Sequence, residues 1–252
     1  MKLTKKIKMH NNKPKVIGII LAYRHAKFLE KLYKSLPLDV LDEVIITNDD
    51  TGDNIEEIAS HLGIPCYSHS RLGYGGNLKY GLKKAMELGA DYMVEIHGDG
   101  QFDPSFIPPA IEKMNEGYDF VLGTRFIDIK QPLRDKMPLT RYLANIALSF
   151  IDRIILRVHI SEFNTGARLY NRKTLEAMDL TNTSNDHLFS FQIIAKTVYY
   201  KFKIGEVSCL CHYDQEHSSI SLKRSVVYAF QSFYVLFLFI LARLGFKSKL
   251  FK

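Results

Sequence analysis

Residues 71–104 have the sequence RLGYGGNLKYGLKKAMELGADYMVEIHGDGQFDP, which contains a turn, a helix, a strand and a second turn. A glycine-rich turn leads into a segment that we predict to be helical as far as Leu88, and 92–96 is a short apolar run typical of a buried strand. The strand ends in the polar turn His97–Asp103, and Pro104 suits the first position of another helix. The unit predicts an α/β fold in which polar residues follow a strand.

The same alternation continues along most of the chain. Apolar runs predict strands at 16–22, 44–47, 64–67, 92–96, 120–122, 167–170 and 204–213, with helical spacing between the earlier ones. Strands that alternate with helices are typical of a mostly parallel sheet covered on both faces. We therefore expect one Rossmann-like α/β domain over 16–222, preceded by a basic arm at 1–15 and followed by an apolar or amphipathic helix and a basic tail at 223–252.

The composition, with 46% hydrophobic and 24% charged residues, is that of a folded protein. The net charge of +7 is concentrated at the ends, because the first fifteen residues carry six cations and the last ten carry four, with no acidic residue in either segment. A nucleic-acid-binding protein would carry its basic stripe on the folded body, so we expect no nucleic-acid partner. Basic ends suit an anionic membrane surface, with solvated tails as the alternative. Three cysteines, an odd number, favour the reducing cytoplasm over a secreted disulfide scaffold.

The segment 225–242 has no charged residue and is the candidate for a membrane contact. As a helix it would be roughly 27 Å long, slightly short for the ~20 residues of a membrane span. Polar residues recur at helical spacing in its first half, at Ser225, Tyr228, Gln231 and Ser232. Cations flank both ends, so we expect a helix that lies in the membrane interface, at the cytoplasmic face. A buried core helix and a true span are the alternatives.

Two acidic clusters follow predicted strands that we expect to be neighbours in the sheet, NDDTGD at 48–53 and HGDGQFD at 97–103. Ligands bind at the carboxyl ends of the strands in an open parallel sheet, and acidic groups there suit a divalent cation with its phosphate ligand. Asp53 and Asp103 have an alternative role as helix caps, whereas Asp99 comes too early to cap the next helix. The glycine turn either offers amides to an anion or is a plain connection.

Residues 71–104 closely resemble family 2 glycosyltransferases, in the branch of dolichol-phosphate mannose synthase. The resemblance extends from Val16 to about Tyr228 and includes the cluster at 48–53, HGDGQ at 97–101, GTR at 123–125 and NTGARLY at 164–170. It implies a GT-A fold, a nucleotide-sugar donor, a divalent metal and inversion at the anomeric carbon. The implied acceptor is a lipid-linked phosphate of the polyprenyl phosphate class. The alternatives are a saccharide hydroxyl acceptor and a non-catalytic nucleotide-sugar-binding protein.

The resemblance also implies roles for individual residues. At the donor nucleotide it places Ala22, Tyr23, Asp49, Gly76 and Asp99. At the metal it places Asp99, Gln101 and His97, and at the acceptor phosphate Arg134, Lys223 and Arg224. The implied catalytic residues are Asp99, Arg125, Arg168 and Asp186, with the two arginines acting on phosphate groups. Their alternative role is a structural ion pair.

Three features depart from the family pattern. His97 stands where the first aspartate of the metal motif is expected, which favours Mn²⁺ over Mg²⁺ unless His97 does not bind the metal. LAYRH at 21–25 replaces the usual motif after the first strand, and paired membrane-spanning helices found in some relatives are not seen in the sequence. Asp186 is needed as a general base only if the acceptor is a hydroxyl, and its alternative role is the cap of a helix starting at Leu188.

Overall fold

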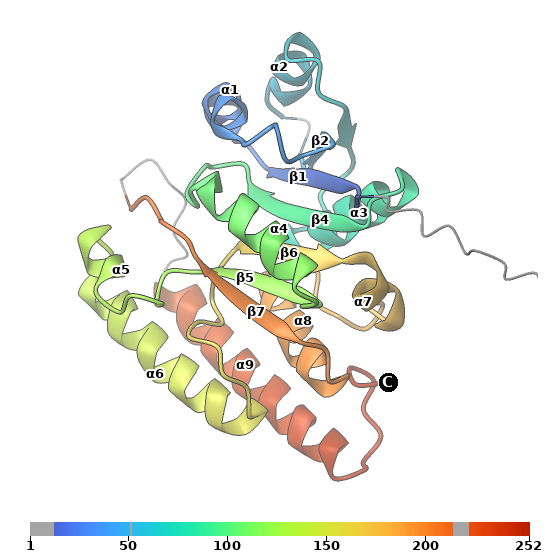
Figure 1. Ribbon diagram of the computed structural model, residues 1–252. Coiled ribbons are helices and arrows are strands. Elements are labelled where there is room, and N and C mark those ends of the chain that lie inside the picture. Colours follow the sequence, from blue (N-terminus) through green and yellow to red (C-terminus); the bar gives the residue numbers. More distant parts are fainter. Residues whose placement is uncertain (1–12, 51, 214–221) are drawn as a thin grey trace, which may run out of the picture.

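The computed structural model describes residues 13–50, 52–213 and 222–252, which form a seven-stranded sheet between layers of helices (Figure 1). Most of the expected basic arm at 1–15 lies outside the described residues. The strands are β1 (Val16–Ala22), β2 (Glu43–Asn48), β3 (Cys66–Ser68), β4 (Tyr92–His97), β5 (Phe120–Thr124), β6 (Ala167–Asn171) and β7 (Ile204–Ser208). The helices are α1 (Ala26–Ser35), α2 (Ile55–His61), α3 (Tyr74–Glu87), η1 (Pro104–Phe106), α4 (Ile107–Asn115), α5 (Gln131–Arg134), α6 (Leu139–Leu156), α7 (Arg172–Ala177), α8 (Phe189–Tyr199) and α9 (Leu222–Arg243).

The sheet has the strand order β3-β2-β1-β4-β6-β5-β7, and its pairs are parallel except those of β6. The prediction of a mostly parallel sheet is therefore confirmed. The antiparallel strand β6 lies between β4 and β5, so that Arg168 is opposite Glu95 on one side and Leu122 on the other. This register brings a charged pair into the centre of the sheet.

Both faces of the sheet are buried, which explains why the strand sequences are nearly continuous apolar runs. In β1, Ile17 and Ile19 face the core shared with α3 and α8, and Val16 and Ile20 face the core shared with α1 and α4. The two faces alternate because successive side chains of a strand point in opposite directions.

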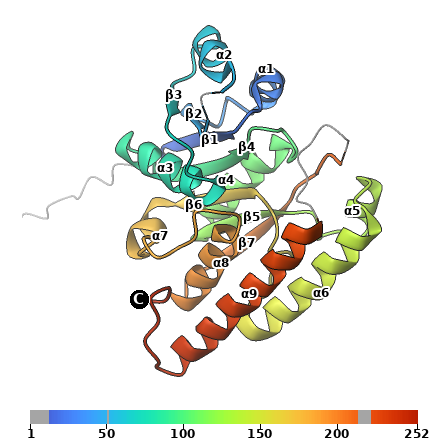
Figure 2. The same cartoon turned by 180° about the vertical axis from the view of Figure 1, so that it is seen from behind.

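Helices α6 and α9 lie side by side on the α8 side of the sheet (Figures 1 and 2). The inner face of α9 places Val235 and Phe239 in the main core, and the chain after α9 folds back so that Phe251 is buried there as well. The Lys196 ammonium donates a hydrogen bond of 2.5 Å to the carbonyl oxygen of Leu250. The last residues of the chain, which were expected to form a basic tail, therefore pack against the domain.

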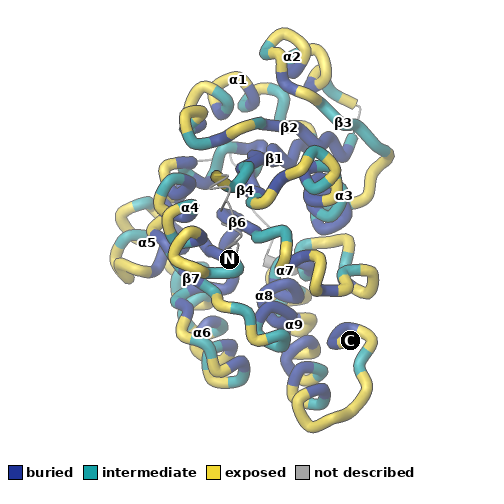
Figure 3. The backbone as a smooth tube through the Cα atoms, turned by 45° about the vertical axis from the view of Figure 1, so that its right-hand side comes forward, coloured by how far each residue is buried: buried dark blue, intermediate teal, exposed yellow. Residues whose placement is uncertain are grey.

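Figure 3 shows exposed positions along α6 and α9; several of these are large apolar residues, while a few polar residues of both helices are buried. Phe230 and Phe237 of α9 are 71% and 54% exposed, whereas Ser232 is buried and Tyr228 is half-buried. Burial, together with the charge of Asp152 on α6, raises the pKa of Tyr228. The polar stripe expected to meet lipid headgroups therefore turns partly toward α6 and the core.

Candidate active site

Three strand ends meet at one edge of the sheet, with β1 between β2 and β4. The backbone amides of Asp49 and Gly98 each donate a 2.9 Å hydrogen bond to the end of β1, at the carbonyls of Ala22 and Leu21. The two acidic clusters are thus brought to the same edge, as predicted. The expectation that they follow neighbouring strands was wrong, because β1 separates them.

Asp49 is buried and fixes the glycine turn. Its two carboxylate oxygens accept hydrogen bonds from the amides of Leu72 (2.6 Å) and Gly73 (3.0 Å), at the start of α3. Gly73 has a φ of +81°, which a residue with a side chain rarely adopts. The side chain expected at the donor nucleotide therefore holds the loop that borders the site.

The glycines of this turn allow two segments to approach closely. The amide of Gly76 donates to the carbonyl of Asn185 (3.1 Å), and a Cβ on Gly75 would lie 2.6 Å from the Cβ of Phe189. The Gly76 amide is therefore engaged by protein, as the plain-connection alternative requires. The packing brings the loop before α8, with Asp186, to the amino end of α3.

The turn after β4 contains the predicted metal residues. Asp99 is 3% exposed, and its Oδ1 accepts a 3.0 Å hydrogen bond from the amide of Gln101. Asp103 accepts from the amide of Ser105 (2.9 Å) at the start of η1, which confirms the cap alternative for Asp103. Asp53 accepts a long hydrogen bond (3.4 Å) from the amide of Ile55, the first residue of α2, although the N-cap of that helix is Asn54.

The donor set at this turn fits a cation that arrives with a phosphate ligand. In the described part of the chain, no three His, Cys, Asp or Glu side chains are arranged to hold a metal. Asp99, Gln101 and His97 offer one carboxylate, one amide oxygen and one imidazole. Magnesium in enzymes is commonly bound through one or two carboxylates plus substrate phosphates, so this small set is sufficient only with such a substrate.

Glu95 is a residue that the sequence motifs missed, and it lies directly beneath this turn. It is fully buried, and its Oε1 accepts hydrogen bonds from Nε2 of His97 (3.1 Å) and from Tyr74, while Oε2 accepts from Tyr170 (2.6 Å). Burial opposes ionisation, but the bond from His97 and the charge of Arg168 hold the pKa of Glu95 below its usual range. The sequence feature that could have revealed Glu95 is its position as a single acidic residue inside the apolar strand YMVEIH.

Arg168 lies inside the molecule rather than at an open site. It is 0% exposed, and its Nε lies 4.0 Å from Oε2 of Glu95. Its Nε donates to the carbonyl of Thr165 (2.9 Å) and its Nη1 to that of Ser190 (3.0 Å). This arrangement matches the structural ion pair that was the alternative to a phosphate contact.

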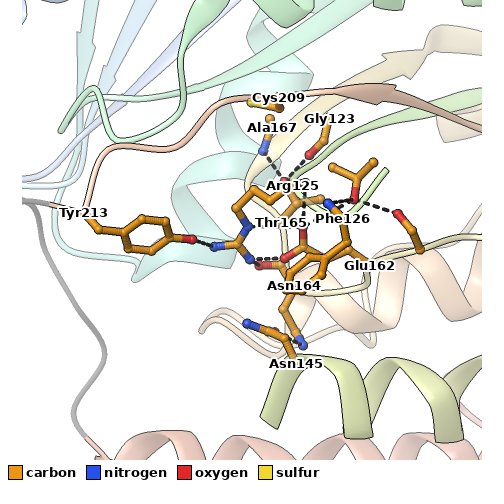
Figure 4. A network of polar contacts seen from close by, with 12 residues as sticks. Gly123, Arg125, Phe126, Asn145, Glu162, Asn164, Thr165, Ala167, Cys209 and Tyr213 are labelled. Carbon is orange, nitrogen blue, oxygen red and sulfur yellow. Dashed lines mark hydrogen bonds and ion pairs between the residues drawn. The ribbon is translucent and has the colours of Figure 1, made fainter. Parts of the chain in front are cut away.

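Arg125 is likewise paired with a buried glutamate (Figure 4). Its Nε donates to Glu162 (3.1 Å), and its Nη2 contacts the same carboxylate. Nη1 contacts the Tyr213 hydroxyl, and Nη2 also donates to the carbonyl of Asn164 (3.1 Å). The guanidinium carbon lies 5.7 Å from the ring centre of Phe102, so Arg125 borders the turn at 97–103, which we call the metal turn. Its guanidinium nitrogens are already engaged by protein groups.

Two further cations lie beside β1 and β2, around Tyr23. The guanidinium carbons of Arg24 and Arg71 are 5.4 Å and 4.7 Å from the centre of the Tyr23 ring. Arg24 also donates to Asp50 (2.9 Å), and this bond lowers the pKa of that carboxyl. The sequence offered only the position after a strand end as a signal for these arginines.

Asp186 and His187 lie in the loop before α8, which contacts the amino end of α3. The Asp186 side chain is 83% exposed, and α8 begins at Phe189 without a side-chain cap, so the cap alternative for Asp186 was wrong. The His187 ring stacks on Tyr74 with a centroid distance of 5.0 Å. Burial, with the nearby charges of His97 and Arg224, lowers the pKa of His187.

The predicted acceptor residues come from two elements. Arg224 in the first turns of α9 lies close enough to act electrostatically on His187. Lys223 precedes it in α9, and its side chain is outside the described part. Arg134 on α5 is mostly exposed and donates to Asp128 at 2.6 Å.

The fold and the site define a class of protein. Residues 19–178 match the glycosyl transferase family 2 domain, and the chain belongs to this family, as its sequence motifs predicted. The sheet and its covering helices have the GT-A architecture. The chain is therefore an enzyme of the sugar-transferring type.

Individual relatives narrow the similarity further. The chain is 30% identical to a UDP-N-acetylglucosamine–dolichyl-phosphate N-acetylglucosaminyltransferase of Methanococcus voltae, over 86% of this chain and 92% of that protein. It is 23% identical to a polyprenol monophosphomannose synthase of Mycolicibacterium smegmatis, over 65% of this chain and 64% of that protein. A solved structure of Mycobacterium tuberculosis glucosyl-3-phosphoglycerate synthase with UDP has a TM-score of 0.67 and 17% identity, over 94% of this chain and 82% of that chain. That enzyme was also crystallised with Mn²⁺ and with Mg²⁺.

Proposed function

We propose that this protein is an inverting glycosyltransferase that moves a sugar from a nucleotide-sugar donor to a lipid-linked phosphate of the polyprenyl phosphate class. The observation that carries the proposal is the exposed apolar face of α9, the helix whose first turn contains Arg224. The charge of Arg224 also contributes to the lowered pKa of His187, which connects this end of α9 electrostatically to the site. The names of the relatives, which specify dolichyl and polyprenyl phosphate acceptors, support the same acceptor chemistry.

Each side of the site has a distinct task in this proposal. Asp99 and Gln101, with His97, would hold Mn²⁺ or Mg²⁺, with Mn²⁺ favoured because one donor is an imidazole. The bound ion would stabilise the charge that grows on the leaving nucleoside diphosphate. Arg24 and Arg71 flank Tyr23 and provide cations beside the strand ends where the donor binds.

A phosphate acceptor requires charge recognition rather than a base. It is already ionised near neutral pH, so no side chain has to remove a proton from it. We assign this recognition to Arg224, with Lys223 and Arg134 as additional cations. An arginine can form two parallel hydrogen bonds with one phosphate group.

A second candidate acceptor is a saccharide hydroxyl. The observation that favours it is Asp186, whose carboxylate is exposed beside His187 and is not used as a helix cap. In that reaction Asp186 would remove the hydroxyl proton as general base.

The protein would work at the cytoplasmic face of a membrane, resting on α6 and α9. The segment Arg224–Arg243 is long and apolar enough to span a membrane, but the inner face of α9 packs against the core. The outer faces carry large apolar side chains, which include Leu143, Phe150 and Ile154 of α6 and Phe230, Tyr234 and Phe237 of α9. Such a surface, flanked by cations, suits burial in the interface of the bilayer rather than a span.

The test compares acceptors and two matched variants. Full-length protein with Mn²⁺ is incubated with radiolabelled UDP- and GDP-sugars and with either polyprenyl phosphate or a free saccharide. Arg224→Gln removes the proposed phosphate contact, and Arg243→Gln changes the same type of residue at the opposite end of α9. A hydrogen bond to a charged group contributes about 1.5–3 kcal/mol, so Arg224→Gln should raise the KM for polyprenyl phosphate by about tenfold or more. Arg243→Gln should leave it unchanged in detergent.

Other outcomes would decide against this proposal. Transfer only to the saccharide, abolished by Asp186→Asn, would establish the second candidate. Donor binding without transfer to either acceptor would instead identify a nucleotide-sugar-binding protein.

A further inference from the structure

Glu95 is a buried charge in the middle of β4 for which the proposed reaction has no use. Both of its oxygens accept hydrogen bonds, Oε1 from Tyr74 and His97 and Oε2 from Tyr170, and Arg168 is its ion-pair partner. A buried carboxylate is tolerated only when it is paired and hydrogen-bonded in this way. The bond to His97 is the part of this network that reaches the metal turn.

The His97 ring is fixed with Nε2 toward Glu95. Residues 95 and 97 lie on the same face of β4, and an ionised carboxylate can only accept, so Nε2 carries the proton in this bond. The ring lies edge-on to Phe102 with a centroid distance of 5.2 Å, and a Cβ on Gly166 would overlap Nε2. Of the two ring nitrogens, Nδ1 is therefore the one available to a ligand.

We propose that Glu95 is a positioning residue that fixes the ring of His97 through Nε2 and thereby assigns Nδ1 to the metal held with Asp99. The proposal rests on the proposed function, because it concerns the metal of that same site. Histidine ligands in metalloproteins usually donate their second N–H to a carboxylate, which sets the ring orientation and makes the ligand more basic. Glu95 and His97 have this relationship.

Glu95 also supplies a negative charge at a site where histidine stands in place of the expected aspartate. Asp99 is the single carboxylate among the three proposed ligands, and imidazole is neutral when it binds a metal. Glu95 places a second negative charge directly behind the imidazole, two residues earlier on the same strand face. The hydrogen bond transmits this charge to the ligand without exposing the carboxylate.

The experiment measures Mn²⁺ binding in the presence of UDP by electron paramagnetic resonance, on full-length protein. Glu95→Gln keeps the shape of the side chain and removes its charge, and should weaken Mn²⁺ binding by about 10–100-fold, as is typical when the carboxylate behind a ligand is changed. Tyr170→Phe is the matched control, because it removes a hydrogen bond from the other oxygen of Glu95 and leaves His97 untouched. It should leave the Mn²⁺ affinity nearly unchanged.

Two further readouts separate positioning from a purely structural role. The ¹⁵N spectrum of the histidine rings without metal should show His97 protonated at Nε2 in the wild type and a displaced Nε2 resonance in Glu95→Gln. Glu95→Gln should also cause no loss of Mn²⁺ affinity when made in a His97→Asp background, where there is no imidazole to position. Thermal unfolding of each variant shows whether it folds. A second test of ring position is Gly166→Ala, because the added Cβ displaces the His97 ring without changing Glu95. Its Mn²⁺ affinity is measured in the same way.

The proposal is overturned if Glu95→Gln has wild-type affinity, if it weakens binding equally in both backgrounds, or if the wild type binds no Mn²⁺ with UDP. The proposed function fails separately. Normal Mn²⁺ binding that depends on Glu95, without transfer to polyprenyl phosphate, would refute the lipid acceptor and leave the role of Glu95 established.

Discussion

Helices α4 and α9 cover opposite faces of the same sheet, and their exposed residues differ in character. Helix α4 buries Ile107 and Ala110 and exposes Glu112, as a helix does when it separates a core from water. Helix α9 exposes Phe230 and buries Ser232. The side that carries α4 therefore has the surface of a helix that faces water, whereas α6 and α9 expose large apolar side chains.

The difference indicates how the reaction would be divided in space. The proposed donor residues lie in loops at the strand ends, and the proposed acceptor residue Arg224 lies where the apolar helix α9 begins. A water-soluble nucleotide sugar and a lipid-borne phosphate could thus approach from two different phases. We call these the donor side and the lipid side, and four predictions test their separation.

The largest expected effect is on the donor side, from Asp99→Ala. Losing the one carboxylate among the three proposed metal ligands should reduce transfer by about three orders of magnitude, the upper end of the range seen when one electrostatic group is removed. Binding to vesicles should not change. Asp103→Ala is the control, because Asp103 caps η1 and its loss should cost only about 1 kcal/mol of stability. An Asp99→Ala enzyme with wild-type turnover would remove Asp99 from the site.

On the lipid side, Phe230→Glu with Phe237→Glu should abolish vesicle binding while donor binding persists. Burying a phenylalanine side chain is worth about 1.5–3 kcal/mol, so each change should weaken partitioning by roughly tenfold to a hundredfold. Flotation with anionic vesicles measures this directly. Leu38→Glu replaces another exposed apolar residue, outside α6 and α9, and should have no effect. Equal binding by all three proteins would mean that the apolar face is not a lipid surface.

Much of the donor side could be predicted from the sequence because its signals are local. The apolar runs and the glycine turn fix the strand and helix order, and Asp103 caps the helix that its position indicated. The strand order could not be predicted, since it depends on contacts between distant segments. For this reason β1 separates two clusters that the sequence suggested were neighbours.

The environments of charged residues were harder to predict. Arg125 and Arg168 stand in motifs that imply phosphate contacts, but their glutamate partners, Glu162 and Glu95, come from remote parts of the chain. The exposure of large apolar residues on α6 and α9 was also hidden, because periodicity defines a face of a helix without showing which way it points. The polar stripe of α9 was correctly located, and its direction required the packed structure.

A substitution of Asp152 on α6 tests the packing between α6 and α9. Burial raises its pKa from 3.8 to about 7, and its Oδ1 has no hydrogen-bond partner among the described residues. The folded state therefore binds more protons than the unfolded state between about pH 4 and pH 7, so this group's contribution to stability is full below pH 4 and is lost as the pH rises through about 7. Asp152→Asn should remove a penalty of up to about 4 kcal/mol at pH 8 and little at pH 4. Urea unfolding of both proteins at the two pH values gives the difference, and a difference that does not change with pH would contradict the buried, protonated state.

The smallest expected effect comes from Arg168→Lys, at the point where the two sides meet. Arg168 pairs with Glu95 on the donor side and acts electrostatically on Tyr228 of α9. Lysine keeps the charge but cannot form the fork that reaches the carbonyls of Thr165 and Ser190, so unfolding should become easier by about 1–3 kcal/mol. Arg134→Lys, an exposed control on α5, should stay within about 0.5 kcal/mol of the wild type. Unchanged stability with lost turnover would instead support the phosphate contact that the sequence motif implied. Parallel losses of stability and of vesicle-dependent activity would show that this buried arginine stabilises the packing between the donor side and the lipid side.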